Sequence, residues 1–236
     1  MSQKALRREM RIWGNLEHPN IVLLHGIIDH PEKHGCYAMV CQWMSQRTII
    51  EYLADRPNFN FRSRLNICLD IAHGLSYLHE QKVIHGDLSP VNVLMDADVA
   101  HLSDFGLSNV IAELQGPSFY ISENSGAARW AAPELLRPAY HEGIEINPVL
   151  TPACDVYSFA SVAFYVITGS TPYSGKRSNN NIIAEIVLST GRYKAPPKPA
   201  ESLLTDACWD ILMMCWALDP AVRPDIAEVE RCLRRL

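Results

Sequence analysis

The fold is decided by the stretch His85-Gly86-Asp87-Leu88-Ser89-Pro90-Val91-Asn92, which is followed by Asp104-Phe105-Gly106 and later by Ala132-Pro133-Glu134. Each segment alone is a weak signal, because a tripeptide such as Asp-Phe-Gly occurs by chance in many proteins. Asp87 and Asn92 also have a purely structural interpretation, since Asp and Asn are common turn residues. The order and the separations of the three segments together favour a functional interpretation.

The sequence around this stretch predicts an α+β fold. Residues 64–78 carry apolar side chains at helical spacing and predict a long amphipathic helix. Two apolar runs, at 21–28 and 37–44, flank a turn rich in His, Pro and Gly and predict an antiparallel strand pair. Further helices are predicted at 2–16, at 156–168, where the helix is buried, and at 182–188, 206–218 and 226–236.

The remaining stretches are predicted to be irregular or very short. Short apolar runs at 93–95 and 99–102 follow the decisive stretch, and residues 108–129 read as a long loop, which in a compact domain is usually functional or disordered. Residues 138–152 and 194–199 read as surface connections. The order predicts two units, residues 1–44 with one helix and two strands, and residues 45–236, which are mainly helical.

Composition excludes several classes of function. The chain has 236 residues, of which 21 are basic and 26 acidic, and no basic stripe indicates nucleic-acid binding. The longest nearly apolar stretch, 156–168, is too short to span a bilayer. Seven cysteines without a CxxC pair, and a start without a secretory signal, indicate a reducing, cytoplasmic location. His25, His30 and His34 lack a metal-ligand pattern.

The three segments resemble the catalytic loop, the metal-binding motif and the end of the activation segment of protein kinases. The resemblance covers the whole chain through Glu9 with Leu16-Glu17-His18-Pro19-Asn20, Asp155-Val156-Tyr157-Ser158-Phe159, and Trp216-Ala217-Leu218-Asp219-Pro220 with Arg223-Pro224. The string Gly-Ala-Ala-Arg-Trp-Ala-Ala-Pro-Glu, residues 126–134, is most similar to the tyrosine-kinase-like group, whose members mostly modify Ser or Thr. The resemblance implies a protein-kinase-like fold, with a partial small lobe in 1–44 and a large lobe in 45–236.

The resemblance also implies a reaction, the transfer of the ATP γ-phosphate to Ser/Thr hydroxyls of protein substrates with Mg²⁺. Catalysis of this transfer depends on positioning and charge neutralisation. Asn92 and Asp104 are implied to hold Mg²⁺ through oxygen atoms. Asp87 is implied to orient the attacking hydroxyl and accept its proton. His85, Phe105, Gly106, Glu9 and Asp155 are implied to be structural or regulatory.

Other residues are implied to surround the nucleotide. Cys41 occupies the gatekeeper position behind the adenine, and Gln42 and Met44 offer backbone groups to the adenine edge. Thr48 reaches the ribose, and Leu94 forms the apolar floor under the base. Plain core packing is an alternative interpretation of Cys41 and Leu94. Glu134 and Arg223 resemble a buried ion pair that braces the activation segment.

Four departures from the family pattern reduce the expected activity. The chain starts inside the small-lobe helix, so it has no glycine-rich loop and no strand with the phosphate-binding Lys that pairs with Glu9. Ser89 stands where Ser/Thr kinases usually have a Lys, Ala127 replaces a Thr, and Gly86 replaces the Arg that reads an activation-loop phosphate. Removing one preorganised charge donor typically costs about 10²–10³ in rate. This chain alone is therefore expected to have little or no activity.

Two functions stay open on this evidence. The intact Asp87, Asn92 and Asp104 favour a kinase whose small lobe is completed by a missing N-terminal segment or a partner chain. Ser89, Ala127 and the absent lysine favour a pseudokinase, a binding or scaffold module.

Overall fold

The computed structural model describes residues 13–29, 37–105, 127–136, 140–141, 144–145, 149–175, 178–187, 195–200 and 203–236. The first part of this chain contains β1 (Leu24–Asp29), β2 (Tyr37–Cys41), α2 (Ile49–Ala54), α3 (Phe61–Glu80), η1 (Pro90–Asn92), β3 (Val93–Asp96) and β4 (Val99–Leu102). The second part contains η2 (Ala127–Arg129), α6 (Pro133–Leu136), β5 (Tyr140–His141), β6 (Ile144–Glu145), α7 (Pro152–Thr168), α8 (Asn179–Val187), α9 (Asp206–Cys215), η3 (Pro220–Val222) and α10 (Ile226–Leu233).

The strands form three separate antiparallel hairpins, β1–β2, β3–β4 and β5–β6. In β1–β2 the register runs from Leu24 opposite Cys41 to Asp29 opposite Tyr37, with a bulge between Leu24 and Gly26. The predicted strand pair is therefore confirmed, although both strands are shorter than the apolar runs. β5 and β6 lie in a stretch that the sequence analysis assigned to a surface connection, and each contains only two residues.

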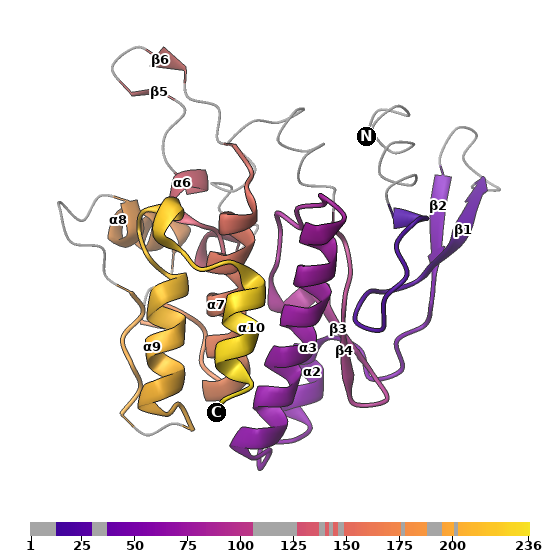
Figure 1. The fold of residues 1–236 in the computed structure, drawn as a ribbon, viewed down its shortest axis with the longest axis horizontal. Helices are drawn as coiled ribbons and strands as arrows, with labels where there is room; N and C mark the ends of the chain where they lie inside the picture. The colour runs from indigo at the N-terminus through magenta and orange to yellow at the C-terminus, as the bar shows by residue number, and fades with distance from the viewer. Residues whose placement is uncertain are drawn as a thin grey trace.

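Helices α3, α7, α9 and α10 form the main body, and β1–β2 lies at the opposite edge, with β3–β4 between them (Figure 1). Helix α3 packs against α7, α10 and β4. It begins at the cap Asn60, whose side chain accepts a hydrogen bond from Ser63 N. One face of the helix is buried, as the predicted amphipathic pattern requires.

The buried helix predicted around residues 156–168 is α7. It begins with Pro152 in its first turn and ends at Gly169, which has φ +72°. A left-handed residue at a helix end favours glycine, because a Cβ would be strained there. Almost every residue of α7 between Cys154 and Ile167 is buried. None of the described helices is both long and apolar enough to cross a membrane.

The segment before β1 is hydrogen-bonded to strand β4 and packs against helix α3. Asn20 Nδ2 donates to Ala100 O at 3.0 Å, and Val22 N donates to Leu102 O at 3.0 Å. Leu102 N in turn donates to Asn20 O at 2.9 Å. On the other side, a Cβ at Gly74 of α3 would lie 2.8 Å from Asn20 O, so only glycine permits this approach. The division into 1–44 and 45–236 stays a prediction. Residues 20–22 of the first part are hydrogen-bonded to residues 100–102 of the second.

The remaining helix predictions are confirmed with shifted ends. The helices predicted at 182–188, 206–218 and 226–236 correspond to α8, α9 and α10. Of the helix predicted at 2–16, only Trp13 is described as helical, and residues 1–12 lie outside the described residues. Most of the loop predicted at 108–129 also lies outside them, and its last three residues form η2.

Candidate functional site

The structure brings Asp87, Asn92 and Asp104 together at the start of the β3–β4 hairpin. η1 ends at Asn92, whose Nδ2 donates to Asp87 O at 2.8 Å and to Asp87 Oδ2 at 3.3 Å. On the other side of the hairpin, Ser103 N donates to Asn92 O at 3.0 Å. The Ser103 hydroxyl contacts both Asn92 O, at 3.3 Å, and Asp104 Oδ2, at 3.2 Å. Ser103 therefore ties Asp104 to the loop that holds Asp87 and Asn92.

Burial changes the acidity of the Asp87 carboxyl. The pKa of Asp87 is raised from an ordinary value of 3.8 to about 6, mainly by loss of solvation and to a lesser extent by the nearby Asp104 charge. The hydrogen bond from Asn92 acts in the opposite direction. A carboxyl with this pKa is mostly ionised at neutral pH and still accepts a proton more readily than an exposed aspartate.

The backbone at Asp104 is unusual. Its φ of +56° lies in the left-handed region, which a non-glycine residue adopts at a cost of about 1–3 kcal/mol. Asp tolerates this region better than most residues. The conformation directs the chain from β4 so that Phe105 is buried while Asp104 stays exposed to solvent. Strained residues of this kind cluster at functional sites.

Phe105 joins the site to its supports. Its ring lies 4.9 Å from that of Trp13 and 6.2 Å from that of His85, measured between centroids. Below His85, the buried Asp155 accepts hydrogen bonds from His85 N at 2.9 Å and Gly86 N at 2.8 Å. Asp155 also contacts His79 Nε2 at 2.8 Å. Asp155 thus fixes the backbone that leads to Asp87.

Gly86 suits this backbone. Its φ is +76°, a left-handed conformation that glycine adopts without a steric penalty. The replacement of the usual Arg by Gly86 therefore avoids backbone strain at this left-handed position. Ser89, another departure, is buried with 6% of its surface exposed, and its carbonyl accepts from Asn92 N at 3.0 Å.

The segment after β2 lies against the β3–β4 hairpin. Cys41 is half-buried, and burial followed by the Asp104 charge raises the pKa of its thiol. Gln42 N donates to Leu23 O at 2.9 Å, and Met44 is buried. No described residue bonds to the Gln42 carbonyl or to Met44 N–H. Leu94 is half-buried and bridges to Thr48 across the two segments.

Thr48 has a structural task. It is the N-cap of α2, and its hydroxyl accepts from Glu51 N and donates to Glu51 Oε2 at 2.8 Å. Glu51 Oε2 in turn accepts from Thr48 N at 3.2 Å, which completes a capping box. The hydroxyl expected to reach a ribose is therefore engaged in starting α2.

Glu134 and Arg223 form a two-pronged ion pair 89 residues apart in sequence. Arg223 Nη1 and Nη2 donate to the Glu134 carboxylate at 2.6 and 2.8 Å. Arg223 also donates to Ala217 O and Ala153 O, each at 2.8 Å. Its side chain is fully buried, and the guanidinium lies over the Tyr157 ring at 5.2 Å. The pair joins α6 to the start of α7 and to η3.

Two of the expected site residues lie outside the described residues, and three residues that support the site were not predicted. Glu9 and Gly106 lie outside the described residues. No site role was predicted for the three supporting residues Trp13, His79 and Ser103. A histidine in the last turn of a long helix, as His79 is, can be recognised as a polar residue at a helix end, but its partner Asp155 is 76 residues away.

The part of the chain that the structure describes places no lysine or arginine next to the three site residues: none lies within ion-pair or hydrogen-bond distance of Asp87, Asn92 and Asp104. The described residues also contain no group of three His, Cys, Asp or Glu side chains arranged to hold a metal. The oxygen donors at the site are therefore two carboxylates and one amide.

Comparison with known proteins agrees with the arrangement. The sequence model of the family described as "Protein tyrosine and serine/threonine kinase" matches residues 1–233. The chain is 32% identical over 240 residues to "Probable serine/threonine-protein kinase SIS8" of Arabidopsis thaliana, covering 99% of this chain and 21% of that protein. It is 30% identical over 237 residues to "Serine/threonine-protein kinase STY17" of the same plant, covering 99% of this chain and 37% of that protein.

A third relative comes from an animal. The chain is 28% identical over 226 residues to "NUAK family SNF1-like kinase 2" of Rattus norvegicus, covering 94% of this chain and 32% of that protein. The chain thus spans about a fifth to a little over a third of the length of these three relatives. The family match over nearly the whole chain and the α+β arrangement around Asp87, Asn92 and Asp104 lead to one conclusion: the chain belongs to the protein tyrosine and serine/threonine kinase family.

Proposed function

We propose that this chain is the phosphotransferase domain of a protein serine/threonine kinase, which transfers the ATP γ-phosphate to Ser or Thr hydroxyls of protein substrates. The observation that carries the proposal is the hydrogen-bonded unit of Asp87, Asn92, Ser103 and Asp104. The unit brings two carboxylates and one amide together, and this arrangement supports their use as a base and two oxygen ligands. Family membership implies the use of ATP and usually of Mg²⁺.

In this proposal Asp87 accepts the proton of the attacking hydroxyl. Its carboxylate is oriented by Asn92 Nδ2 at 3.3 Å, and the raised pKa makes it a better proton acceptor than an exposed aspartate. Asp155 holds the loop through His85 N and Gly86 N, so the base has a fixed position. Phe105 connects this support to Trp13.

The donor set fits Mg²⁺. Magnesium prefers carboxylate and amide oxygens, which Asp104 and Asn92 provide. The Nδ2 of Asn92 bonds to Asp87, and no described residue donates to its amide oxygen. This oxygen is therefore available to a metal ion. When bound, Mg²⁺ neutralises phosphate charge and ATP supplies the phosphoryl group. Burial is the main cause of the raised pKa of Asp87, and the Asp104 charge adds to it, so a cation between the two carboxylates would relieve both effects.

We place the adenine against the segment after β2. The Gln42 carbonyl and Met44 N–H have no partner among the described residues, so one acceptor and one donor remain for a base edge. Cys41 and Leu94 supply apolar surface, and the protonated thiol of Cys41 suits this task. Thr48 serves the site through the cap of α2, and its hydroxyl donates a hydrogen bond to a ribose only if it leaves Glu51 Oε2.

Serine and threonine are the proposed acceptors. The printed names of the relatives SIS8 and STY17 describe serine/threonine-protein kinases, and this supports the same acceptor class here. The Gly-Ala-Ala-Arg-Trp-Ala-Ala-Pro-Glu string at 126–134 supports it independently.

A pseudokinase is the second candidate. The observation in its favour is that none of the described lysines and arginines contacts Asp87, Asn92 or Asp104, and that Ser89 is buried where a lysine is usual. We infer that an active form receives the lysine that faces Glu9 from a partner chain or from a further chain segment. Without that charge the same site binds nucleotide weakly and transfers little phosphate.

The test is transfer of radiolabelled phosphate from ATP to matched peptides that differ only in a Ser, Thr or Tyr acceptor. It is run on this chain, and on the chain joined to a small lobe that places a Lys opposite Glu9. We expect transfer by the completed protein to Ser and Thr, and its loss in Asp104→Asn. A completed, folded protein that binds Mg-ATP and transfers nothing above Asp104→Asn would instead establish the pseudokinase.

A further inference from the structure

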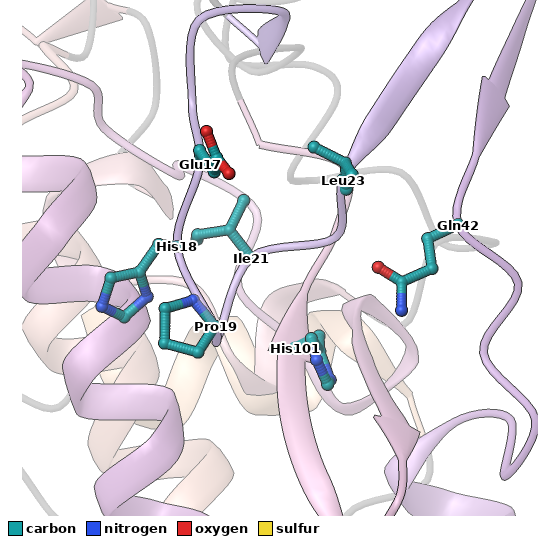
Figure 2. A pocket seen from close by; sticks show the side chains of 7 residues that line it. All are labelled: Glu17, His18, Pro19, Ile21, Leu23, Gln42 and His101. Atoms are coloured by element: carbon teal, nitrogen blue, oxygen red, sulfur yellow. The ribbon is translucent and has the colours of Figure 1, made fainter.

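A concave site lies beside the segment before β1; its lining does not include Asp87, Asn92 or Asp104, and it shares Gln42 with the segment proposed to contact adenine. It is a cavity of about 310 Å³ lined by Glu17, His18, Pro19, Ile21, Leu23, Gln42 and His101. These residues come from three places: the segment before β1, the residue after β2, and strand β4 (Figure 2). The volume is at the lower end of the range for small-molecule pockets, so the cavity fits one small group or one long side chain.

The floor of the cavity is apolar and firmly held. Ile21 is buried, and Pro19 and Leu23 complete the apolar lining. Backbone hydrogen bonds run from Val22 N to Leu102 O, at 3.0 Å, and from Gln42 N to Leu23 O, at 2.9 Å. The three lining segments therefore form one hydrogen-bonded layer. A site of this kind needs little reorganisation when it binds a ligand.

Two polar side chains around this floor, those of Glu17 and Gln42, lack partners among the described residues. The Glu17 carboxylate and the Gln42 amide make no hydrogen bond or ion pair with them. His101 is engaged at one ring nitrogen, because its Nδ1 donates to Val99 O at 3.1 Å. Figure 2 shows the Gln42 amide pointing inward, toward Ile21 and His101.

The remaining polar residue does not add positive charge. Asn20 N donates to His18 Nδ1 at 3.1 Å, and the ring stacks on Tyr77 at 4.8 Å between centroids. Burial, and after it the neighbouring His73, lowers the pKa of His18, so this imidazole is neutral at ordinary pH. The cavity thus offers one carboxylate and one amide oxygen as acceptors, and no lysine or arginine lines it.

We propose that this cavity, formed by Glu17, Ile21, Leu23, Gln42 and His101, binds an arginine side chain of a protein partner. A guanidinium is planar, carries five N–H donors and cannot be deprotonated, so it satisfies several acceptors at once. Its aliphatic stem covers Ile21 and Leu23. An anion is disfavoured by Glu17. The net charge of −5 adds a general attraction for basic partners.

Arginine is preferred to lysine for a geometric reason. The ammonium of lysine is a compact point charge and would serve Glu17, but it would leave the Gln42 amide oxygen without a donor. The contact would place a partner against the segment before β1 and the residue after β2. The site is independent of Asp87 and Asp104, so it is tested without any measurement of activity.

The test uses three peptides, acetyl-Ala-Arg-Ala-amide and the same peptide with citrulline or lysine in place of arginine. Citrulline keeps the shape of arginine and removes the charge. Binding to the full, isotopically labelled chain is followed by NMR, with the Gln42 side-chain amide as the local probe. We expect saturable shifts for the arginine peptide in the millimolar range, weaker ones for lysine and none for citrulline.

Variants separate the cavity from general charge attraction. Glu17 is exposed, so Glu17→Gln leaves the fold intact, and it should weaken the arginine peptide about fivefold. Asp210→Asn removes the same charge from α9, on the other side of the molecule (Figure 1), and should leave binding unchanged. Equal binding of citrulline, equal losses in the two variants, or no shift at the Gln42 amide would overturn the proposal.

Discussion

Arg223→Ala is predicted to be among the most destabilising single changes in the chain. The substitution removes two hydrogen bonds to Glu134, at 2.6 and 2.8 Å, and those to Ala217 O and Ala153 O. It also leaves Glu134 next to the Cys154 thiol, whose pKa is raised to about 12 by burial and by this carboxylate. Breaking a buried pair from one side costs about 3–5 kcal/mol, because an uncompensated charge remains.

For a chain of this size each kcal/mol corresponds to about 2–4 °C, so the unfolding midpoint should fall by about 6–20 °C. The assay is thermal unfolding followed by circular dichroism. Arg234→Ala is the matched control, since Arg234 is more than half exposed and pairs with Glu230 at 2.8 Å on one helix. Such surface pairs contribute at most about 1 kcal/mol.

A double-mutant cycle with Glu134→Ala separates the pair from other losses at Arg223. The two changes together should cost less than their sum by about 1–3 kcal/mol. An Arg223→Ala midpoint within the range of the Arg234→Ala control, or strictly additive losses in the cycle, would refute the reasoning.

Three further predictions concern the site. Asp87→Asn should stabilise the fold by about 1–3 kcal/mol at about pH 7.5 and have little effect near pH 4. The pKa of Asp87 is about 6 in the folded chain against an ordinary value of 3.8, so ionisation of this buried carboxyl lowers the free energy of unfolding as pH rises through that window. A pH-independent effect in denaturant titrations would contradict the burial argument. Thr48→Ala should lower stability by about 1 kcal/mol through loss of the α2 cap without changing the affinity for Mg-ATP. A large loss of affinity in calorimetry would instead show that Thr48 contacts the ribose. Phe105→Ala should cost about 3–5 kcal/mol, since the ring is 1% exposed between Trp13 and His85; a chemical denaturation curve like that of the unmodified chain would show that this packing is unimportant.

The sequence predicted the long helices because their signal is local and repeated. Helix α3 has twenty residues with one buried face, so its periodicity is visible without any knowledge of its neighbours. Helix α2 was not predicted, because six residues give too short a pattern. Its Thr48-Ile49-Ile50-Glu51 capping box is a sequence signal that could have revealed it. Strands β5 and β6 have two residues each and give no such signal.

The candidate site divides in the same way. Asp87, Asn92 and Asp104 lie within eighteen positions and could be named from motifs, whereas their supports depend on distant contacts. Asp155 holds a loop that is about 70 residues away in sequence, and Trp13 reaches Phe105 across more than 90 positions. The family resemblance assigned Thr48 to the ribose, whereas the capping-box pattern in the sequence points to its observed partner, Glu51.

The most direct test of the central claim compares the initial rate of phosphate transfer by the small-lobe-completed protein with that of its Asp87→Asn variant. Both are measured with saturating Mg-ATP and one Ser-containing peptide, and folded protein is quantified in each sample. The proposal assigns the proton of the attacking hydroxyl to Asp87, so the variant should be slower by about 10²–10⁴ while still binding Mg-ATP. Equal rates in the two proteins, or no transfer by either one, would contradict the assignment of this site to phosphoryl transfer.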